Sequence, residues 1–209
     1  TGLPDSYAMM VKANVHKLTF STHGLENFVK GWAPSVNLDL DKFCKGEQLT
    51  FRGRTSGPLN RLHAHGTMHT DFGKADLNVT LRNVIDPNRP LEIGGSASTE
   101  RLDIGRIMAG IPVGECDMRT GLNATFAKDS LGIIIDSLYV DGLDVLGYKY
   151  SNIAAVGTFS QDAFDGRIVC SDPNLNFLFQ GIFSLSSKTK NALYQFYANL
   201  GYADLHALN

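Results

Sequence analysis

Three histidines with the spacing of a β-strand are the first residues in this sequence that could do chemistry. His63, His65 and His69 have the same parity, so their imidazoles would project from one face of a strand. A catalytic zinc needs about three such ligands, and this spacing therefore raises the hypothesis of a metal-dependent enzyme. The opposite parity from Leu62 to Met68 is small or apolar, however, and an amphipathic strand of this kind turns its histidines toward solvent.

Other residues of catalytic type form no recognisable pattern. The sequence contains no G-x-S-x-G motif, no cysteine with a nearby histidine in a known signature, and no paired acidic motif on a helix. Cys44, Cys116 and Cys170 are widely spaced and form no C-x-x-C, which argues against a disulfide framework and a zinc ribbon. We predict that the three cysteines are small, buried or half-buried thiols. We also predict that the protein is not an enzyme and uses no metal or cofactor.

Composition excludes further classes of protein. The chain has 209 residues, of which 43% are hydrophobic, and can therefore bury a substantial core. Its net charge of -2 and its scattered basic residues lack the electrostatic footprint of a nucleic-acid binder. The longest apolar runs fall far short of the roughly 20 residues that span a bilayer. The start at Thr1-Gly2-Leu3 has neither an initiator methionine nor a signal peptide, so we expect a piece of a longer protein.

The stretch from Gly147 to Ser186 is the most informative part of the sequence. It contains three consecutive period-two patterns, each closed by a turn signal, which is typical of half-buried β-strands. The last pattern follows Asp172-Pro173-Asn174 and is mostly polar on one parity. Its other parity carries Leu175, Phe177, Phe179, Phe183 and Leu185. Such a stripe either seals a core or lines a surface for hydrocarbon.

Similar strand patterns recur from end to end. The parity changes between Val15 and Leu18, which predicts a bulge near His16-Lys17. The segment from Leu131 to Val140 is apolar on both parities, which predicts a strand covered on both faces. The final alternating set is Tyr194, Phe196, Ala198, Leu200 and Tyr202.

Helical spacing is confined to two short segments. They are Gly24 to Lys30 and Glu100 to Ala109. Thr55-Ser56-Gly57-Pro58 has the composition of a turn. Roughly a dozen short strands with two brief helices therefore predict a mainly β protein.

The sequence also hints at a repeat. Asp86-Pro87-Asn88 and Asp172-Pro173-Asn174 both flank strands. We therefore expect residues 1–209 to form a single β segment, with two sub-repeats of about 1–110 and 111–209 as the alternative.

The order of several short motifs resembles the AsmA-like superfamily, in particular its TamB-like translocation and assembly modules. The motifs are Gly147-Tyr148-Lys149-Tyr150-Ser151-Asn152-Ile153, Gly157, Phe164-Asp165-Gly166 and Asp172-Pro173-Asn174-Leu175. Other pieces of the same proteins resemble Thr1-Gly2-Leu3-Pro4-Asp5, Phe51-Arg52-Gly53, Gly57-Pro58-Leu59 and the closing segment from Tyr202 to Asn209. The resemblance covers most of the chain.

The resemblance implies a fold, a location and a function. The fold would be an elongated antiparallel β-sheet rolled into an open, solenoid-like groove (a β-groove or β-taco) with an apolar interior. The location would be the periplasm of a Gram-negative bacterium, in a protein anchored to the inner membrane by a helix outside this sequence. The function would be phospholipid transport between the inner and outer membranes, or outer-membrane protein assembly. Phospholipid acyl chains and outer-membrane assembly proteins would be the partners.

A hydrocarbon-lined groove is physically reasonable for this sequence. An acyl chain gains roughly 0.8 kcal/mol per buried CH₂, and a uniform lining without polar anchors would let it slide. Our candidates for the lining are Leu77, Val79, Leu81, Leu122, Ala124, Phe126, Leu175, Phe177, Phe179, Phe183 and Leu185. The alternative is a structural or protein-interaction β module without a lipid path, which would bind its partner at an exposed sheet edge.

Overall fold

The computed structural model describes residues 9–32, 48–86, 88–107, 112–127, 130–160, 163–184 and 194–208. Its elements are β1 (Met10–Ser21), α1 (Thr22–Trp32), β2 (Gln48–Pro58), β3 (Arg61–Thr70), β4 (Gly73–Arg82), β5 (Leu91–Glu100), β6 (Leu102–Asp103), α3 (Ile104–Ile107), β7 (Val113–Ala127), β8 (Ser130–Val145), β9 (Tyr148–Tyr150), β10 (Ile153–Ser160), β11 (Ala163–Asp172), β12 (Leu175–Ser184) and β13 (Tyr194–Ala203).

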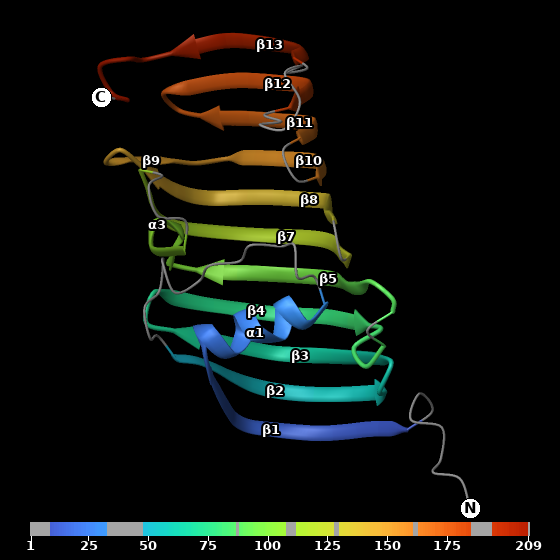
Figure 1. The fold of residues 1–209 in the computed structure, drawn as a ribbon. Coiled ribbons are helices and arrows are strands. Elements are labelled where there is room, and N and C mark those ends of the chain that lie inside the picture. The colour runs from blue at the N-terminus through green and yellow to red at the C-terminus, as the bar shows by residue number, and fades with distance from the viewer. Residues whose placement is uncertain are drawn as a thin grey trace, which may run out of the picture.

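All of the described strands belong to one antiparallel sheet of 13 strands (Figure 1). The main path runs β1-β2-β3-β4-β5-β7-β8-β10-β11-β12-β13, and the short strands β6 and β9 pair beside it. The sheet is not closed, because β1 and β13 lie at its opposite edges. Strands stack about 4.8 Å apart, so the main path is roughly 50 Å long. The predicted mainly β fold, with an elongated rolled sheet and two short helices, is therefore confirmed.

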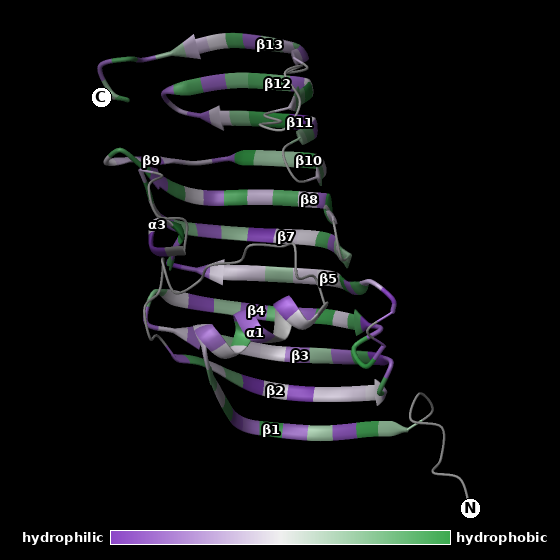
Figure 2. Ribbon diagram, in the orientation of Figure 1, coloured by the Kyte–Doolittle hydropathy of each residue, from purple (hydrophilic) through white to green (hydrophobic). Residues whose placement is uncertain are grey.

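Side-chain alternation gives this sheet one apolar face. Hydrophobic and hydrophilic residues alternate along most strands (Figure 2). The antiparallel register aligns the apolar positions of successive strands into rows across the sheet. One row is Leu81, Ile93, Ala124, Ile133, Phe159, Phe164, Phe183 and Tyr194. We call the face that carries this row the inner face.

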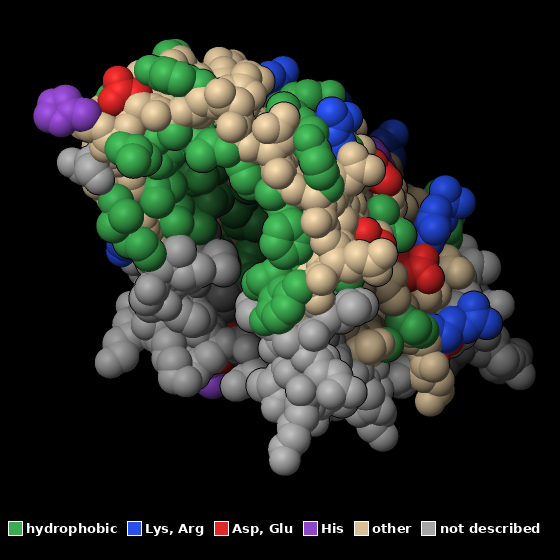
Figure 3. Space-filling model, turned by 90° about the horizontal axis from the view of Figure 1, so that it is seen from above, with side chains coloured by type: hydrophobic (Ala, Val, Ile, Leu, Met, Phe, Trp, Pro, Cys, Tyr) green, Lys and Arg blue, Asp and Glu red, His purple; other side chains and the backbone are tan. Residues whose placement is uncertain are grey.

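The sheet is rolled around its inner face. Seen along the stack of strands, it curves around a hollow whose visible lining is hydrophobic (Figure 3). Glycines permit close approach on this face. Gly157 and Gly166 are direct partners on β10 and β11, and a Cβ on Gly166 would lie 2.8 Å from the Gly157 Cα and 2.7 Å from the Phe164 Cζ. The Phe164 ring therefore occupies the space that side chains would otherwise fill.

Helix α1 follows β1, crosses in front of β3 and β4 (Figure 1) and packs against residues of the inner face. The Ser21 hydroxyl caps the start of this helix, because it accepts a hydrogen bond from the backbone N–H of Gly24 at 3.1 Å. Leu25 then contacts a small core cluster formed by Leu49 and Phe72. No helix in the described residues is long and apolar enough to span a membrane.

Several predicted boundaries are confirmed and others are wrong. The register shifts between Val15 and Leu18, where we predicted a bulge. The helix predicted from Gly24 lies within α1. Thr55 to Pro58 is part of β2, so the predicted turn is wrong, and the chain turns at Leu59-Asn60 instead. In the predicted second helix, only Ile104–Ile107 is helical among the described residues.

Two predictions about faces are also wrong. Ile134 and Tyr139 of β8 are more than half exposed, because no second layer covers the outer face of the described sheet there. Tyr202 does not share the parity of Leu200, since a bulge at Gly201 shifts the register and places Tyr202 opposite Asn176. Val36, Leu38 and Leu40 alternate in the sequence as in a strand, but they lie outside the described residues.

Candidate functional site

The register places the predicted lining residues on the inner face. Three of them lie on β4, three on β7 and four on β12, and all ten are apolar. Cross-strand pairing joins them through residues of the strands between them. Val79 and Leu122, for example, are both paired with Gly95 of β5. Leu185 lies outside the described residues. The inner face is thus one continuous, mainly apolar surface that also includes Thr120, rather than three separate stripes.

The strands between β7 and β12 supply lining residues that the sequence prediction missed. Ile133, Phe159 and Ile168 lie on the inner face of β8, β10 and β11. Their alternation was visible in the sequence. What was missing was the register, which decides whether two alternating stripes meet on one face or lie on opposite faces.

Aromatic rings form the part of the inner face nearest β13. The ring centroids of Phe164 and Phe179 are 6.2 Å apart, and those of Phe179 and Phe196 are 5.2 Å apart. A second contact joins Phe183 and Tyr194 at 5.3 Å. These tilted arrangements are in the range that favours aromatic pairs. The rings form a ladder that runs up to the edge strand.

Most of the inner face is half-buried rather than sealed. Leu77, Leu122, Phe177 and Phe179 are all of intermediate exposure, whereas Ala124 is buried. A sandwich core would bury large side chains of this kind almost completely. In the described part of the chain, the rolled sheet therefore keeps an apolar surface that another apolar molecule could contact.

The outer face is largely polar and carries the three histidines. His63, His65 and His69 are exposed on β3, on the solvent face that the alternation predicted. The His63 Nδ1 lies 3.3 Å from the Thr80 Oγ1. Among the described residues, no group of three His, Cys, Asp or Glu side chains could hold a metal ion.

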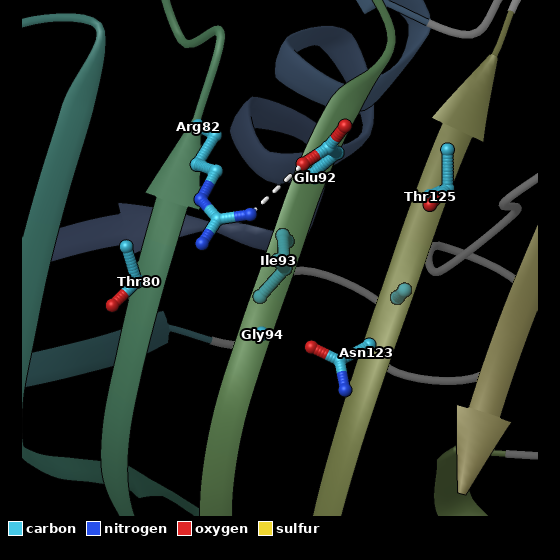
Figure 4. A pocket seen from close by; sticks show the side chains of 8 residues that line it. Thr80, Arg82, Glu92, Ile93, Gly94, Asn123 and Thr125 are labelled. Atoms are coloured by element: carbon cyan, nitrogen blue, oxygen red, sulfur yellow. Dashed lines mark hydrogen bonds and ion pairs between the residues drawn. The ribbon is translucent and has the colours of Figure 1, made fainter.

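A polar pocket of about 280 Å³ lies on β4, β5 and β7 (Figure 4). Arg82 and Glu92 form an ion pair across it at 3.5 Å, and Asn123 and Thr125 line its other side. Ion pairs as exposed as this one contribute little to stability. Among the described residues, no hydrogen bond joins the hydroxyl of Thr80 or Thr125 to the Glu92 carboxylate, whose partner is Arg82.

A buried carboxylate braces one end of the strands near β12. Asp172 accepts hydrogen bonds from the Tyr148 hydroxyl at 2.5 Å, from both the N–H and the hydroxyl of Ser151 at 2.8 Å, and from the Asn174 N–H at 2.9 Å. Burial acts to raise the pKa of Asp172, but these hydrogen bonds outweigh it and hold that pKa below its ordinary value. The hydrogen bond to Asp172 in turn raises the pKa of Tyr148. This cluster belongs to the motifs on which the family resemblance rests, and its geometry is that of a structural brace.

The Asp86 turn shares one feature with this brace. The Asn88 N–H donates to Asp86 Oδ1 at 3.0 Å, as the Asn174 N–H does to Asp172. Both are Asx turns. The predicted sub-repeats are thus alike at this turn, although one continuous sheet contains both.

The two described cysteines are buried free thiols, as predicted, and Cys44 lies outside the described residues. Burial, with a smaller contribution from the Asp117 carboxylate, raises the pKa of Cys116 to about 11. Burial also raises the pKa of Cys170. Since the thiolate is the nucleophile and the metal ligand, the raised pKa makes both thiols less reactive than an exposed cysteine.

The chain matches no family model, no curated protein and no solved structure.

Proposed function

We propose that this chain is a non-enzymatic segment of a periplasmic envelope protein and that its rolled sheet conducts phospholipid acyl chains. The observation that carries the proposal is the continuous, half-buried apolar inner face, which curves around a hollow (Figure 3). The sequence resemblance to TamB-like modules supports the same location and substrate. It also leaves open a role in outer-membrane protein assembly, since the family is associated with both.

The chemistry of the inner face suits movement better than tight binding. Each buried CH₂ of an acyl chain would gain roughly 0.8 kcal/mol anywhere along a hydrocarbon wall. The row from Leu81 to Tyr194 offers Leu, Ile, Ala, Phe and Tyr, and none of these side chains is charged near neutral pH. A charged headgroup would stay in water at the open side, because burying it unpaired is costly.

Photocrosslinking to a defined lipid tests the proposal. The probe is phosphatidylethanolamine with a diazirine in one acyl chain, incubated with the 209-residue protein. Phe179→Asp places a charge in the aromatic ladder, whereas Gln180→Asp places the same charge on the exposed outer face of the same strand. If the charge displaces as few as two CH₂ groups from the wall, the loss of about 1.6 kcal/mol lowers binding roughly tenfold.

We expect crosslinking of the wild-type protein and of Gln180→Asp, and a loss of about tenfold for Phe179→Asp. Circular dichroism and thermal unfolding verify that both variants are folded. Wild-type yield from a folded Phe179→Asp protein would show that this wall does not contact the acyl chain.

The exposed edge of β13 favours a second candidate, a β module that binds a protein partner without carrying lipid. In that case the wild-type protein would give no more lipid crosslinking than heat-denatured protein. A lipid crosslink that depends on Phe179 and not on Gln180 would instead rule out this candidate as the sole function.

A further inference from the structure

Strand β13 forms one edge of the described sheet, and its side chains are unusual for an edge. Among the described strands it pairs with β12 alone. Phe196, Tyr197 and Leu200 are between 52% and 60% exposed. No residue from Tyr194 to Ala203 is charged or a proline. A long, uncharged edge of this kind is a template for pairing with another strand.

The opposite edge of the sheet is protected against such pairing. Strand β1 carries the exposed residues Lys12 and Lys17, and it is interrupted by the bulge between Val15 and Leu18. Charges and bulges are the features that blunt an edge strand. Because the eleven strands of the main path alternate in direction, β1 and β13 run in the same direction. Head-to-tail assembly that keeps both inner faces on the same side would therefore need a parallel pair between these two edges, which is slightly less stable.

The β13 edge is complementary to itself. The bulge at Gly201 limits its regular part to seven residues, from Tyr194 to Leu200, whose midpoint is Tyr197. We propose that β13 pairs antiparallel with β13 of a second copy, about a two-fold axis at Tyr197. On the inner face this register places Phe196 opposite the partner's Ala198, and Tyr194 opposite the partner's Leu200. On the outer face it places Gln195 opposite the partner's Asn199, and Tyr197 opposite the partner's Tyr197.

Each of these opposed pairs is favourable. A large side chain faces a small or aliphatic one on the inner face, two amides can exchange hydrogen bonds on the outer face, and two tyrosine rings meet at the axis. No like charges face each other, since the strand has none. The two-fold axis is perpendicular to the sheet, so both inner faces lie on the same side. The aromatic ladder of Phe179 and Phe196 would continue into the second copy, and the trough would be about 100 Å long.

Sedimentation velocity of the purified protein without lipid tests the pairing. We expect the wild-type protein to be a dimer that dissociates on dilution. Tyr197→Lys opposes two lysines at the axis and should give a folded monomer. Mixing Tyr197→Lys with Tyr197→Glu should restore a dimer, because the opposed charges then attract. Lys12→Glu on the β1 edge is the matched control and should leave the dimer unchanged.

Cysteine crosslinking tests the register in a Cys44→Ser background that keeps the buried Cys116 and Cys170. Tyr197→Cys should form an intermolecular disulfide readily, and Asn199→Cys should not. A mixture of Gln195→Cys and Asn199→Cys should form a mixed disulfide. A wild-type protein that is monomeric at every concentration, a dimer unaffected by Tyr197→Lys, or equal crosslinking of positions 197 and 199 would each overturn the proposal. These readouts need no lipid, so they succeed or fail separately from the proposed transport function.

Discussion

At the scale of single residues, Asp172 is the side chain on which most of the local hydrogen bonding near β12 depends. It is 6% exposed and accepts hydrogen bonds from Tyr148, Ser151 and Asn174. Asp172→Asn keeps the shape of the side chain but replaces one accepting oxygen with an amide N–H₂, which would face the hydrogen-bond donors of Tyr148, Ser151 or Asn174. We expect it to lower the free energy of unfolding by about 1–3 kcal/mol, the usual result of leaving buried polar groups unpaired. Urea denaturation measures the loss, and Asp165→Asn, exposed on the same strand, should change stability little.

The same carboxylate should make stability depend on pH in the acid range. The folded pKa of Asp172 is lowered relative to an unfolded value of about 3.9. Its stabilisation is therefore complete above pH of about 4 and is lost as pH falls through the folded pKa. Between about pH 5 and pH 2, the wild-type protein should lose more stability than Asp172→Asn. Parallel loss in the two proteins would mean that Asp172 is not the responsible group.

The close contact of β10 and β11 makes a second residue-scale prediction. A Cβ at position 166 would collide with the Val156 carbonyl oxygen and the Gly157 Cα. Gly166→Ala should therefore lower the free energy of unfolding by about 1–3 kcal/mol, as overpacking usually does. Gly132→Ala is the matched control in a strand, because nothing lies within 4 Å of its Cβ position. Chemical denaturation of both variants gives the comparison, and equal stabilities would contradict the proposed close approach.

At the scale of elements, substitutions on the two faces of β8 should change the free energy of unfolding by different amounts, because only one face is covered. Val140 on the inner face is 6% exposed, and Ile134 on the outer face is 51% exposed. Val140→Thr buries a hydroxyl and should lower the free energy of unfolding by about 1–3 kcal/mol. Ile134→Thr should change it by no more than about 0.5 kcal/mol. Similar large losses for both would support the original prediction of a strand covered on both faces.

The successes and failures of sequence prediction in this fold have a common cause. Local alternation located most described strands, and its phase change marked the bulge after Val15. Alternation does not say what covers a face, so the apolar outer positions of β8 were misinterpreted. Turn composition misled at Thr55 to Pro58, because the pairing of β2 with both neighbours outweighs the local preference of Ser, Gly and Pro.

Only part of the lining of the inner face was predicted, because alternation within a strand does not show which strands share a face. Stripes on β4, β7 and β12 have clear periodicity and were recognised. Glycines interrupt the apolar stripes of β10 and β11. Gly157 lies two residues before Phe159 on β10, and Gly166 lies two residues before Ile168 on β11. The recognised stripe of β12 is interrupted in the same way at Gly181, so the information that was missing is the register that pairs β10 and β11 with β12.

At the scale of the whole molecule, the sheet is a linear array. Each strand of the main path pairs with the strands beside it. Helix α1 adds contacts to the small core cluster of Leu49 and Phe72 near the β1 end of the sheet. In repeat proteins built this way, stability is close to a sum of local and nearest-neighbour terms. The long strands β7 and β8, of 15 and 16 residues, should therefore be more stable than either edge.

Hydrogen exchange measured by mass spectrometry at two protein concentrations tests this array and its edges together. Backbone amides of β7 and β8 should exchange most slowly, and those of β1 should exchange fastest at both concentrations, because local opening needs least energy at a free edge. Amides of β13 should behave like those of β1 in dilute protein and become protected in concentrated protein, when the second copy pairs with that edge. Equal exchange rates in all strands would show instead that the sheet opens as one cooperative unit. Protection of β13 that does not change with concentration would mean that something other than a second copy covers its edge.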